Sequence, residues 1–404
     1  MEAYRAYLDA ISRRLEPELR AVALFSSDIP EARAEAAALT RDEFVWRKFL
    51  AYASRHQIVA HVLAGMRATE GLRAPDAVYD ELRTTAKRVA KRSLLLASEA
   101  LGTTPALEAA GIRALVMKGP ALSSLLHGDY GVRPMHDVDV FVAKRDVRKL
   151  DETLRAMGFE WDDYDGEFTP RQRRALMYCS DDLIYRHPKK PYLLEAHWRL
   201  FDVGEAREDG ETILRESVAR EQATGTTWLT PKPETELLYL LDHGAKHQWM
   251  NLKWLHDVAL YPRRVSVDWE EFGGLARRAD AERTAAQGLA LAEALTRAPA
   301  PEFARKAVVE SRVVRSAIED AIYALNEGDK LYPMRGWSRV GYYLTRLRLR
   351  RRVSSKVGML VRKFLFQPRD WLAVPLPDFL FFLYFPLRPV IPIYRRLLKR
   401  DADR

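Results

Sequence analysis

Apolar residues recur at helical spacing in the first 110 residues of the chain. Such spacing places apolar side chains on one face of a helix. The apolar positions that lie among polar ones here include Phe44, Phe49, Ile58, Val59, Val62 and Leu63. Asp76 stands where a capping residue belongs, ahead of a long helix predicted through residues 78–101. Residues 1–110 are therefore predicted to form a helical region.

The pattern changes after Gly111. Residues 112–117 form a short apolar run typical of a strand, and residues 118–128 follow as a turn and a helix. Residues 133–142 alternate apolar and acidic positions, and a helix is predicted from there to Gly158. Two further strand-like runs, DDLIYR and YLLEAHWRL, are joined by HPKKP, which predicts a hairpin. This mixed order indicates a small α/β core over about residues 112–202.

Helical periodicity returns over residues 234–330, with its strongest segment at ETELLYLLDHGAKHQWMNLKWLHDVALY. The predicted fold class is thus α+β, a small mixed β-sheet flanked by N-terminal and C-terminal helical regions. The predicted domains are a helical lead-in (1–110), the α/β core (111–232), a helical domain that completes a cleft (233–330), and a C-terminal tail (331–404).

Charge is distributed unevenly along the 404 residues. Residues 331–404 contain 17 Lys and Arg against 4 Asp and Glu, a net charge of +13, so residues 1–330 carry −4 of the total of +9. The tail is also rich in aromatic residues and prolines, and we weigh three roles for it: packing on the body, contact with a membrane surface, or nucleic-acid binding. Packing is favoured, because prolines and charges interrupt its apolar runs. It predicts that Trp371, Phe381 and Phe385 are buried against the same chain.

Cysteine content and the lack of long apolar segments bear on the cellular location of the protein. Cys179 is the single cysteine, so no intramolecular disulfide forms. The first residues lack the apolar segment of a signal peptide, and no uncharged run approaches the roughly 20 residues of a membrane-spanning helix. These features favour a cytoplasmic protein, with membrane association left open through the basic tail.

Asp137 and Asp139 flank Val138 on a predicted strand. Residues two apart in a strand point to the same face, so the two carboxylates stand side by side, while Val138, Val140 and Val142 form the opposite, buried face. Like charges this close are costly unless a cation neutralises them. Mg²⁺ prefers carboxylates, water and substrate phosphates, so the pair suits phosphoryl-transfer chemistry.

Two further elements fit that chemistry. Lys118 and Gly119 end the first strand and open a helix, where free N–H groups and the helix dipole favour phosphate; Ser123 adds a hydroxyl in the same helix. Glu195, on a neighbouring predicted strand, could supply a third carboxylate as a metal ligand or as a general base. Taken alone, each of these elements is also compatible with a purely structural role.

Taken together, the motifs resemble a known family. KGPALSSLLHGDYGVRPMHDVDVFV, LLEAHWRL and LLDHGAKHQWMNLKWLHDVALY look like the uncharacterised bacterial nucleotidyltransferase family of the polymerase-beta superfamily. The resemblance extends over about residues 40–390. It implies a nucleotidyltransferase core and a transferase that uses an NTP, with Mg²⁺, or Mn²⁺ in its place, as cofactor.

The resemblance also implies roles for individual residues. Asp137, Asp139 and Glu195 would be the catalytic and metal-binding triad. Lys118, Gly119 and Ser123 would lie near the nucleotide phosphates, and Arg133 would stand at the mouth of the site. His243, His247 and Asp257 would line it. The histidine pair has i, i+4 spacing that also occurs in zinc sites, but Gly244 stands where zinc proteases have glutamate.

Three functions follow as hypotheses. The favoured one moves an NMP group from an NTP to an unidentified acceptor. The second uses the same site to transfer a terminal phosphate, as a kinase does, because superfamily membership does not decide which phosphorus is attacked. The third is a non-catalytic nucleotide-binding scaffold at a membrane surface, against which the retained acidic residues argue. The acceptor, the choice of NTP and the oligomeric state are not specified by the sequence.

Overall fold

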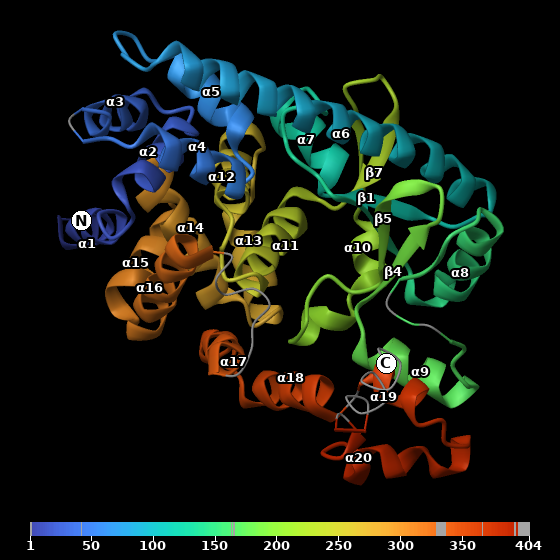
Figure 1. Ribbon diagram of the computed structural model, residues 1–404. Coiled ribbons are helices and arrows are strands. Elements are labelled where there is room, and N and C mark those ends of the chain that lie inside the picture. The colour runs from blue at the N-terminus through green and yellow to red at the C-terminus, as the bar shows by residue number, and fades with distance from the viewer. Residues whose placement is uncertain are drawn as a thin grey trace.

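A small mixed sheet lies within a mostly helical chain (Figure 1), which confirms the predicted α+β class. The computed structural model describes residues 2–394 except residues 42, 163, 165, 329–336, 366 and 392. The sheet has five strands in the order β1-β2-β5-β4-β3. Their bounds are β1 Ala114–Met117, β2 Asp137–Val142, β3 Glu160–Trp161, β4 Asp182–His187 and β5 Lys190–His197.

The strand pairing confirms most of the predicted core. β2 pairs with β1 antiparallel and with β5 parallel, and β4 and β5 form the antiparallel hairpin predicted at HPKKP. Between β1 and β2 lies α7 (Gly119–His127); after β2 follow the short η1 (Lys144–Asp146) and α8 (Val147–Ala156). The short edge strand β3 and the separate hairpin of β6 (Val218–Glu221) and β7 (Thr227–Thr230) were not predicted.

The N-terminal helices share one hydrophobic core with the helices that follow the sheet. Phe25 and Phe49 from the first group and Leu289 and Ile318 from the second belong to it, and Tyr4 Oη donates a hydrogen bond of 2.7 Å to Glu293. The first group is α1 Glu2–Ser12, α2 Pro17–Phe25, α3 Pro30–Leu39, α4 Trp46–Arg55 and α5 Val59–Arg67. The second is α11 Pro233–Lys246, α12 Leu252–Arg264, α13 Trp269–Arg278, α14 Glu282–Thr296, α15 Glu302–Glu310 and α16 Arg312–Glu327.

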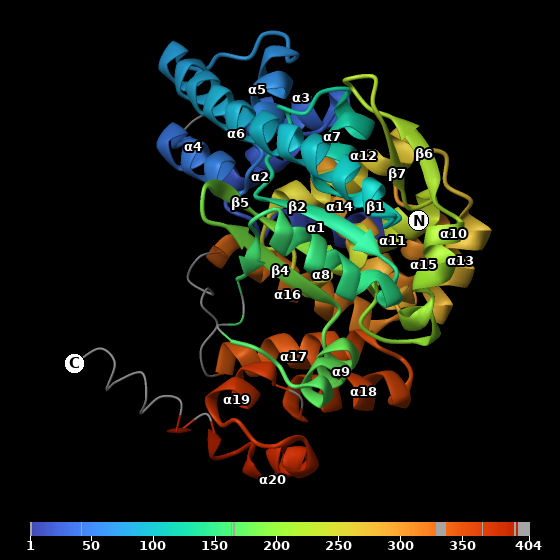
Figure 2. The ribbon, with the colours of Figure 1, turned by 90° about the vertical axis from the view of Figure 1, so that its right-hand side faces the viewer.

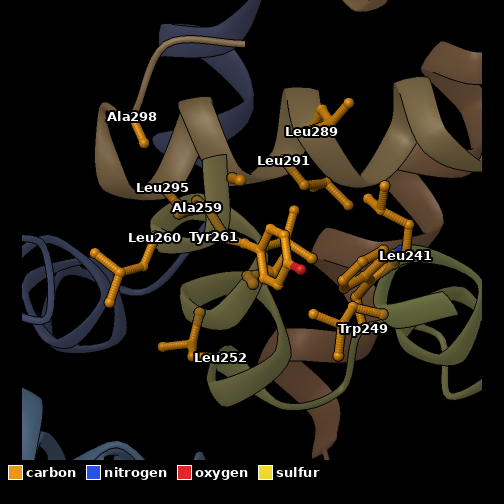
Figure 3. Close-up of a cluster of buried hydrophobic side chains, with 14 of the residues drawn as sticks. Leu241, Trp249, Leu252, Ala259, Leu260, Tyr261, Leu289, Leu291, Leu295 and Ala298 are labelled. Carbon is orange, nitrogen blue, oxygen red and sulfur yellow. The ribbon is translucent and has the colours of Figure 1, made fainter. Parts of the chain in front are cut away.

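The segment predicted as the strongest helix consists of two helices, α11 and α12. Between them Gln248 and Trp249 have positive φ angles of 53° and 56°, so the chain turns and Trp249 is inserted into the core shown in Figure 3. The indole lies so close to Gly244 and Gly288 that a β-carbon at either position would overlap it. Position 244 therefore requires glycine, because any side chain there would collide with Trp249. This packing explains why glycine stands where zinc proteases have glutamate.

A second core covers the other face of the sheet. Val138, Val140 and Val142 of β2 face it, as the alternation predicts. The long helix α6 (Asp76–Ala109) contributes Leu96 and Leu107 to this core and runs along one side of the molecule (Figure 1). Asp76 is its first helical residue, and Pro75, not Asp76, occupies the capping position.

The described part of the tail packs on the body, as predicted; residues 331–336 and 395–404 of the predicted tail lie outside the described residues. Trp371 and Phe381 are buried in the second core, where Trp371 meets the ring of Phe168, and Phe385 is half-buried. The tail elements are α17 Trp337–Leu349, α18 Val353–Leu365, α19 Pro368–Ala373, η4 Asp378–Leu383 and α20 Tyr384–Leu387. Figures 1 and 2 both show the tail elements on the far side of the molecule from α6, where α19 and η4 contact α9 (Pro170–Cys179) and α17 contacts α16.

Two of the described tail arginines form buried ion pairs with the body. Arg346 pairs with Asp202, and Arg350 donates a 2.6 Å hydrogen bond to Asp242. Both arginines are buried, so part of the basic charge neutralises acidic residues of the body. Phe379 and Phe382 stay exposed, and membrane contact through them stays a prediction. Within the described part of the chain, no helix is long and apolar enough to cross a bilayer.

Candidate active site

The pairing of β2 with β5 brings three predicted acidic residues together. Asp139 lies directly opposite Glu195 in the parallel register, and Asp137 lies opposite Leu193. Because side chains alternate along a strand, Asp137, Asp139 and Glu195 project from the same face of the sheet. Asp139 is fully buried, because other parts of the chain cover the face that carries it. A cluster of three carboxylates on neighbouring strands results.

The turn after β1 inserts a cation into this cluster. Lys118 Nζ lies 2.8 Å from Asp139 Oδ1, and both side chains are buried. Lys118 has φ 44° and ψ −140°, a backbone conformation that a residue with a β-carbon rarely adopts. Strain of this kind persists where the surrounding structure holds it, often at functional sites. Lys118 is therefore held in place against the carboxylates by the fold.

His197 is a member of the cluster that sequence reasoning did not single out. Its Nε2 lies 3.1 Å from Asp139 Oδ1 and 3.4 Å from Glu195 Oε2, and the ring is buried. Burial alone would lower the pKa of His197, but Tyr239, Asp139 and Glu195 together raise it well above the usual value. The sequence did contain an indication of this role: His197 is two residues after Glu195, so both side chains point to the same face of β5.

The two aspartates of β2 have pKa values shifted in opposite directions. Burial acts to raise the pKa of Asp139, but Lys118 and His197 outweigh it and hold that pKa below its usual range. Burial, with the charge of Asp139, raises the pKa of Asp137 to about 6. The three carboxylates of Asp137, Asp139 and Glu195 thus carry more negative charge than Lys118 and His197 neutralise.

The donor atoms fit a divalent cation. Asp139 Oδ2 is buried and has no hydrogen-bond partner among the described residues. Asp139 and Glu195 each offer a carboxylate oxygen within 4.8 Å of a ring nitrogen of His197. His197 could join them as a ligand only after losing the proton that its raised pKa retains. A buried carboxylate oxygen without a donor is costly, and a cation would satisfy it. Carboxylate oxygens suit Mg²⁺, and the added imidazole is also compatible with Mn²⁺.

These residues line a cavity of about 330 Å³ between the sheet and α11 and α12. Lys118, Gly119, Arg133, His243 and His247, all predicted from the sequence, lie on its wall with the three carboxylates. Gly119, with φ 37°, opens α7 at the cavity. Lys246 and Lys253 from the opposite helices add further positive charge. A cavity with acids on one side and several cations around them suits a metal-bound polyphosphate.

Arg133 is fixed by Asp257, another of the predicted residues. The guanidinium donates from Nε to Oδ1 at 2.9 Å and from Nη2 to Oδ2 at 2.8 Å, and both side chains are buried. Asp257 does not line the cavity; it holds Arg133, which does. The pair joins the loop before β2 to α12.

His243 and His247 form an aromatic wall with Trp254. Their rings lie 4.6 Å apart, and the His247 ring stacks on Trp254 with ring centroids 5.0 Å apart. Burial, with the nearby lysines, lowers the pKa of His247 to about 3 and that of His243 well below its usual value. Both rings are therefore neutral at physiological pH. Neutral aromatic rings at the side of a polyphosphate cavity suit a nucleoside, since a base has a flat π face.

Residues 42–297 match a family described as uncharacterised nucleotidyltransferases, which is more than half of the 404 residues. The chain belongs to this family. No curated protein sequence matches it. Membership supports a transferase, and nucleotidyl transfer as its general reaction.

Like Asp257, the predicted residue Ser123 of this nucleotidyltransferase lies outside the cavity. Ser123 is fully buried in α7, and its hydroxyl donates a 2.6 Å hydrogen bond to the Asp129 carbonyl. It closes the loop after α7 and does not line the cavity wall. The helix start contributes Gly119 and the preceding Lys118, not the serine hydroxyl.

A second group of acids at the cavity was not predicted. Asp181, Asp182, Asp202 and Asp242 line its other end. Burial and the charge of Asp202 raise the pKa of Asp181 to about 7, whereas tail and body cations, with a hydrogen bond to Asp181, hold the pKa of Asp202 low despite its burial. Because Asp202 and Asp242 pair with Arg346 and Arg350, the tail of the nucleotidyltransferase supports one end of the cavity.

Proposed function

We propose that this protein is a Mg²⁺-dependent nucleotidyltransferase of the polymerase-beta superfamily, with Mn²⁺ able to replace Mg²⁺. It moves an NMP group from an NTP to a nucleophilic group of an acceptor. The acceptor attacks the α-phosphorus, the bond from that phosphorus to the β-phosphate oxygen breaks, and pyrophosphate leaves. The observation that carries this proposal is the placement of Asp137, Asp139 and Glu195 on neighbouring parallel strands, at a cavity lined by cations.

Different residues of the cavity bind the metal ions, the phosphates and the base in this proposal. Asp137, Asp139 and Glu195 hold the divalent ions, which supply neutralisation of charge at the phosphates when bound. Lys118 and Arg133 offset charge on the triphosphate and the leaving pyrophosphate. Lys253, whose pKa burial and Arg133 lower to about 8, adds a cation at the same cavity. His247 and Trp254 form the wall proposed to receive the base.

Glu195 has a specific expected effect. Replacing Glu195 with glutamine keeps the shape of the side chain and removes its charge, so it removes a metal ligand or a general base. We expect the rate of nucleotidyl transfer to fall by roughly 10²-fold or more, the usual scale for loss of a general base. The measurement is the initial rate of pyrophosphate release at saturating NTP.

Glu160 provides the matched control. It lies on β3 at the edge of the same sheet and is exposed, so Glu160→Gln makes the same change away from the cavity. This variant should retain the wild-type rate. Equal rates for Glu195→Gln and the wild type would remove Glu195 from the mechanism.

The proposed function is tested with labelled nucleotides. Each of the four NTPs, carrying label at the α- or the γ-phosphate, is incubated with the protein, Mg²⁺ and fractionated cell extract. Transfer of the α label with release of pyrophosphate supports nucleotidyl transfer. Transfer of the γ label with release of NDP would identify a kinase and overturn the proposal. Calorimetry with a non-hydrolysable NTP and Mg²⁺ checks nucleotide binding without an acceptor, and no binding by any of the four would also count against it.

A further inference from the structure

Three histidines from separate parts of the chain meet away from the catalytic cavity. His61 belongs to α5, His127 ends α7, and His256 lies in α12. His61 and His256 are buried and His127 is half-buried. Their rings are close: the centroids of His61 and His256 lie 4.1 Å apart, and those of His61 and His127 lie 4.8 Å apart. None of the three lines the catalytic cavity.

The nitrogen atoms of the three rings have the spacing of metal ligands. One nitrogen from each ring lies within 4.8 Å of one nitrogen of the other two. The Nε2 atoms of His61 and His127 lie 3.3 Å apart. Zinc–nitrogen bonds of about 2.0–2.1 Å place two ligands of a tetrahedral ion about 3.3–3.4 Å apart. The observed separation therefore matches one edge of such a tetrahedron.

The cluster also contains buried nitrogens that no hydrogen bond satisfies. His61 Nδ1 and His256 Nε2 have no hydrogen-bond partner among the described residues. A hydrogen bond between His61 and His127 would use one nitrogen of each ring and leave these two unsatisfied. Buried polar atoms without a partner are rare in folded proteins because each loses its hydration. An ion bound through His61 Nε2 would leave His61 Nδ1 unsatisfied, so of these two atoms only His256 Nε2 could gain a partner from a shared ion.

We propose that His61, His127 and His256 bind a zinc ion, with a water molecule as the fourth ligand. Three imidazole ligands suit Zn²⁺ and other borderline metals, and are poor ligands for the Mg²⁺ proposed at the carboxylates. Burial is the largest influence on all three rings and lowers their pKa values, so they are neutral, the form that binds metal. The nearby charge of Arg133 is neutralised by Asp257, which limits its repulsion of a cation.

The proposed zinc site would connect three regions of the fold through one histidine from each. α5 belongs to the N-terminal helices, α7 to the sheet core, and α12 to the later helical region; Figures 1 and 2 show α7 beside α12, and the two helices pack together. A zinc ion bound by one side chain from each would link all three. Because His256 precedes Asp257 in α12, the same link would steady the residue that orients Arg133.

The test measures zinc on the full chain produced without a histidine tag. The protein is stripped with a chelator, incubated with ZnCl₂, passed through a desalting column and analysed by mass spectrometry for bound metal. About one zinc ion per chain is expected for the wild type and almost none for His127→Ala, as for the loss of one ligand of a three-histidine site. Cobalt(II) should give the visible absorption of a tetrahedral site in the wild type, which needs no variant to fold.

Two controls separate this site from other binding. His187→Ala removes a half-buried histidine from β4, outside the cluster, and should keep the zinc. Asp139→Asn disrupts the carboxylate cluster, where His197 also lies, and should keep it as well. Zinc lost in Asp139→Asn but kept in His127→Ala would assign the metal to the catalytic cavity and overturn the proposal. Wild-type protein that retains no zinc and gives no tetrahedral cobalt spectrum would overturn it too.

Discussion

The substitution Asp139→Asn is expected to lower the rate of nucleotidyl transfer by roughly 10³-fold or more. Metal ions stabilise the charge of such transition states by several kcal/mol, and each 1.4 kcal/mol corresponds to about tenfold in rate. Asparagine matches aspartate in size but carries no charge, so the cluster loses the carboxylate that lies between Lys118 and Glu195. The unpaired Oδ2 atom, which we assign to a cation, is also lost or replaced by a donor.

The same variant has a readout that does not depend on activity. Binding of Mn²⁺, followed by electron paramagnetic resonance, should weaken together with the rate, because Asp139 is a proposed ligand. Asp162→Asn is the control: Asp162 is exposed just beyond β3, at the edge of the same sheet, and its replacement should change neither measurement. A folded Asp139→Asn protein with wild-type turnover would contradict the proposed metal site.

The stability of Asp139→Asn must be recorded as well, because Asp139 is buried. Lys118 would lose its contact at 2.8 Å, although Asp137 and Glu195 stay close enough to favour its charge. We therefore expect a lower melting temperature with the fold retained. Circular dichroism distinguishes this outcome from unfolding.

The local parts of the site could be predicted because they depend on periodicity and turn chemistry. Asp137 and Asp139 share a face because strand side chains alternate, and Val138 and Val140 fill the opposite face, as expected. Lys118 and Gly119 follow a strand and open a helix, which a short apolar run followed by a glycine and a proline indicates. These inferences need only neighbouring residues.

The partners of these residues could not be predicted by the same means. The placement of Glu195 opposite Asp139 depends on the parallel pairing of β2 with β5, which no local pattern specifies. The sequence offered Glu195 only as a candidate third carboxylate on a neighbouring strand, and the family resemblance gave it a place in the triad. Lys253 and Lys246 reach the cavity because of how α11 and α12 pack on the sheet. The acids at its other end and the tail arginines that pair with them are separated by more than 100 residues.

The missed elements have a common physical cause, which is weak apolar periodicity. α9 reads PRQRRALMYC and buries only Gln172, Leu176 and Cys179, so its apolar face is narrow. Its start does carry a signal, since Thr169 and Gln172 form a capping box. β3 has two residues, and β6 and β7 have four each, which is too short for alternation to stand out.

The largest expected effect on stability comes from Asp257→Asn. The substitution leaves the buried Arg133 guanidinium without its charged partner, and breaking a buried pair in this way costs about 3–5 kcal/mol. The urea midpoint of unfolding should fall accordingly. Asp80→Asn breaks the exposed pair with Arg83 at 2.9 Å and serves as the matched control. Exposed pairs contribute less than about 1 kcal/mol, so its midpoint should hardly move.

A double variant separates the structural from the functional part of this pair. Arg133→Met with Asp257→Leu removes both charges together, and apolar replacement of a buried pair is often neutral for stability. We therefore expect the double variant to recover most of the stability that Asp257→Asn loses. Its activity should stay low, because the arginine that lines the cavity is gone and the charge on the phosphates is no longer offset. Recovery of both stability and turnover would show that Arg133 acts only as a structural partner of Asp257, and would remove it from the proposed phosphate-binding residues.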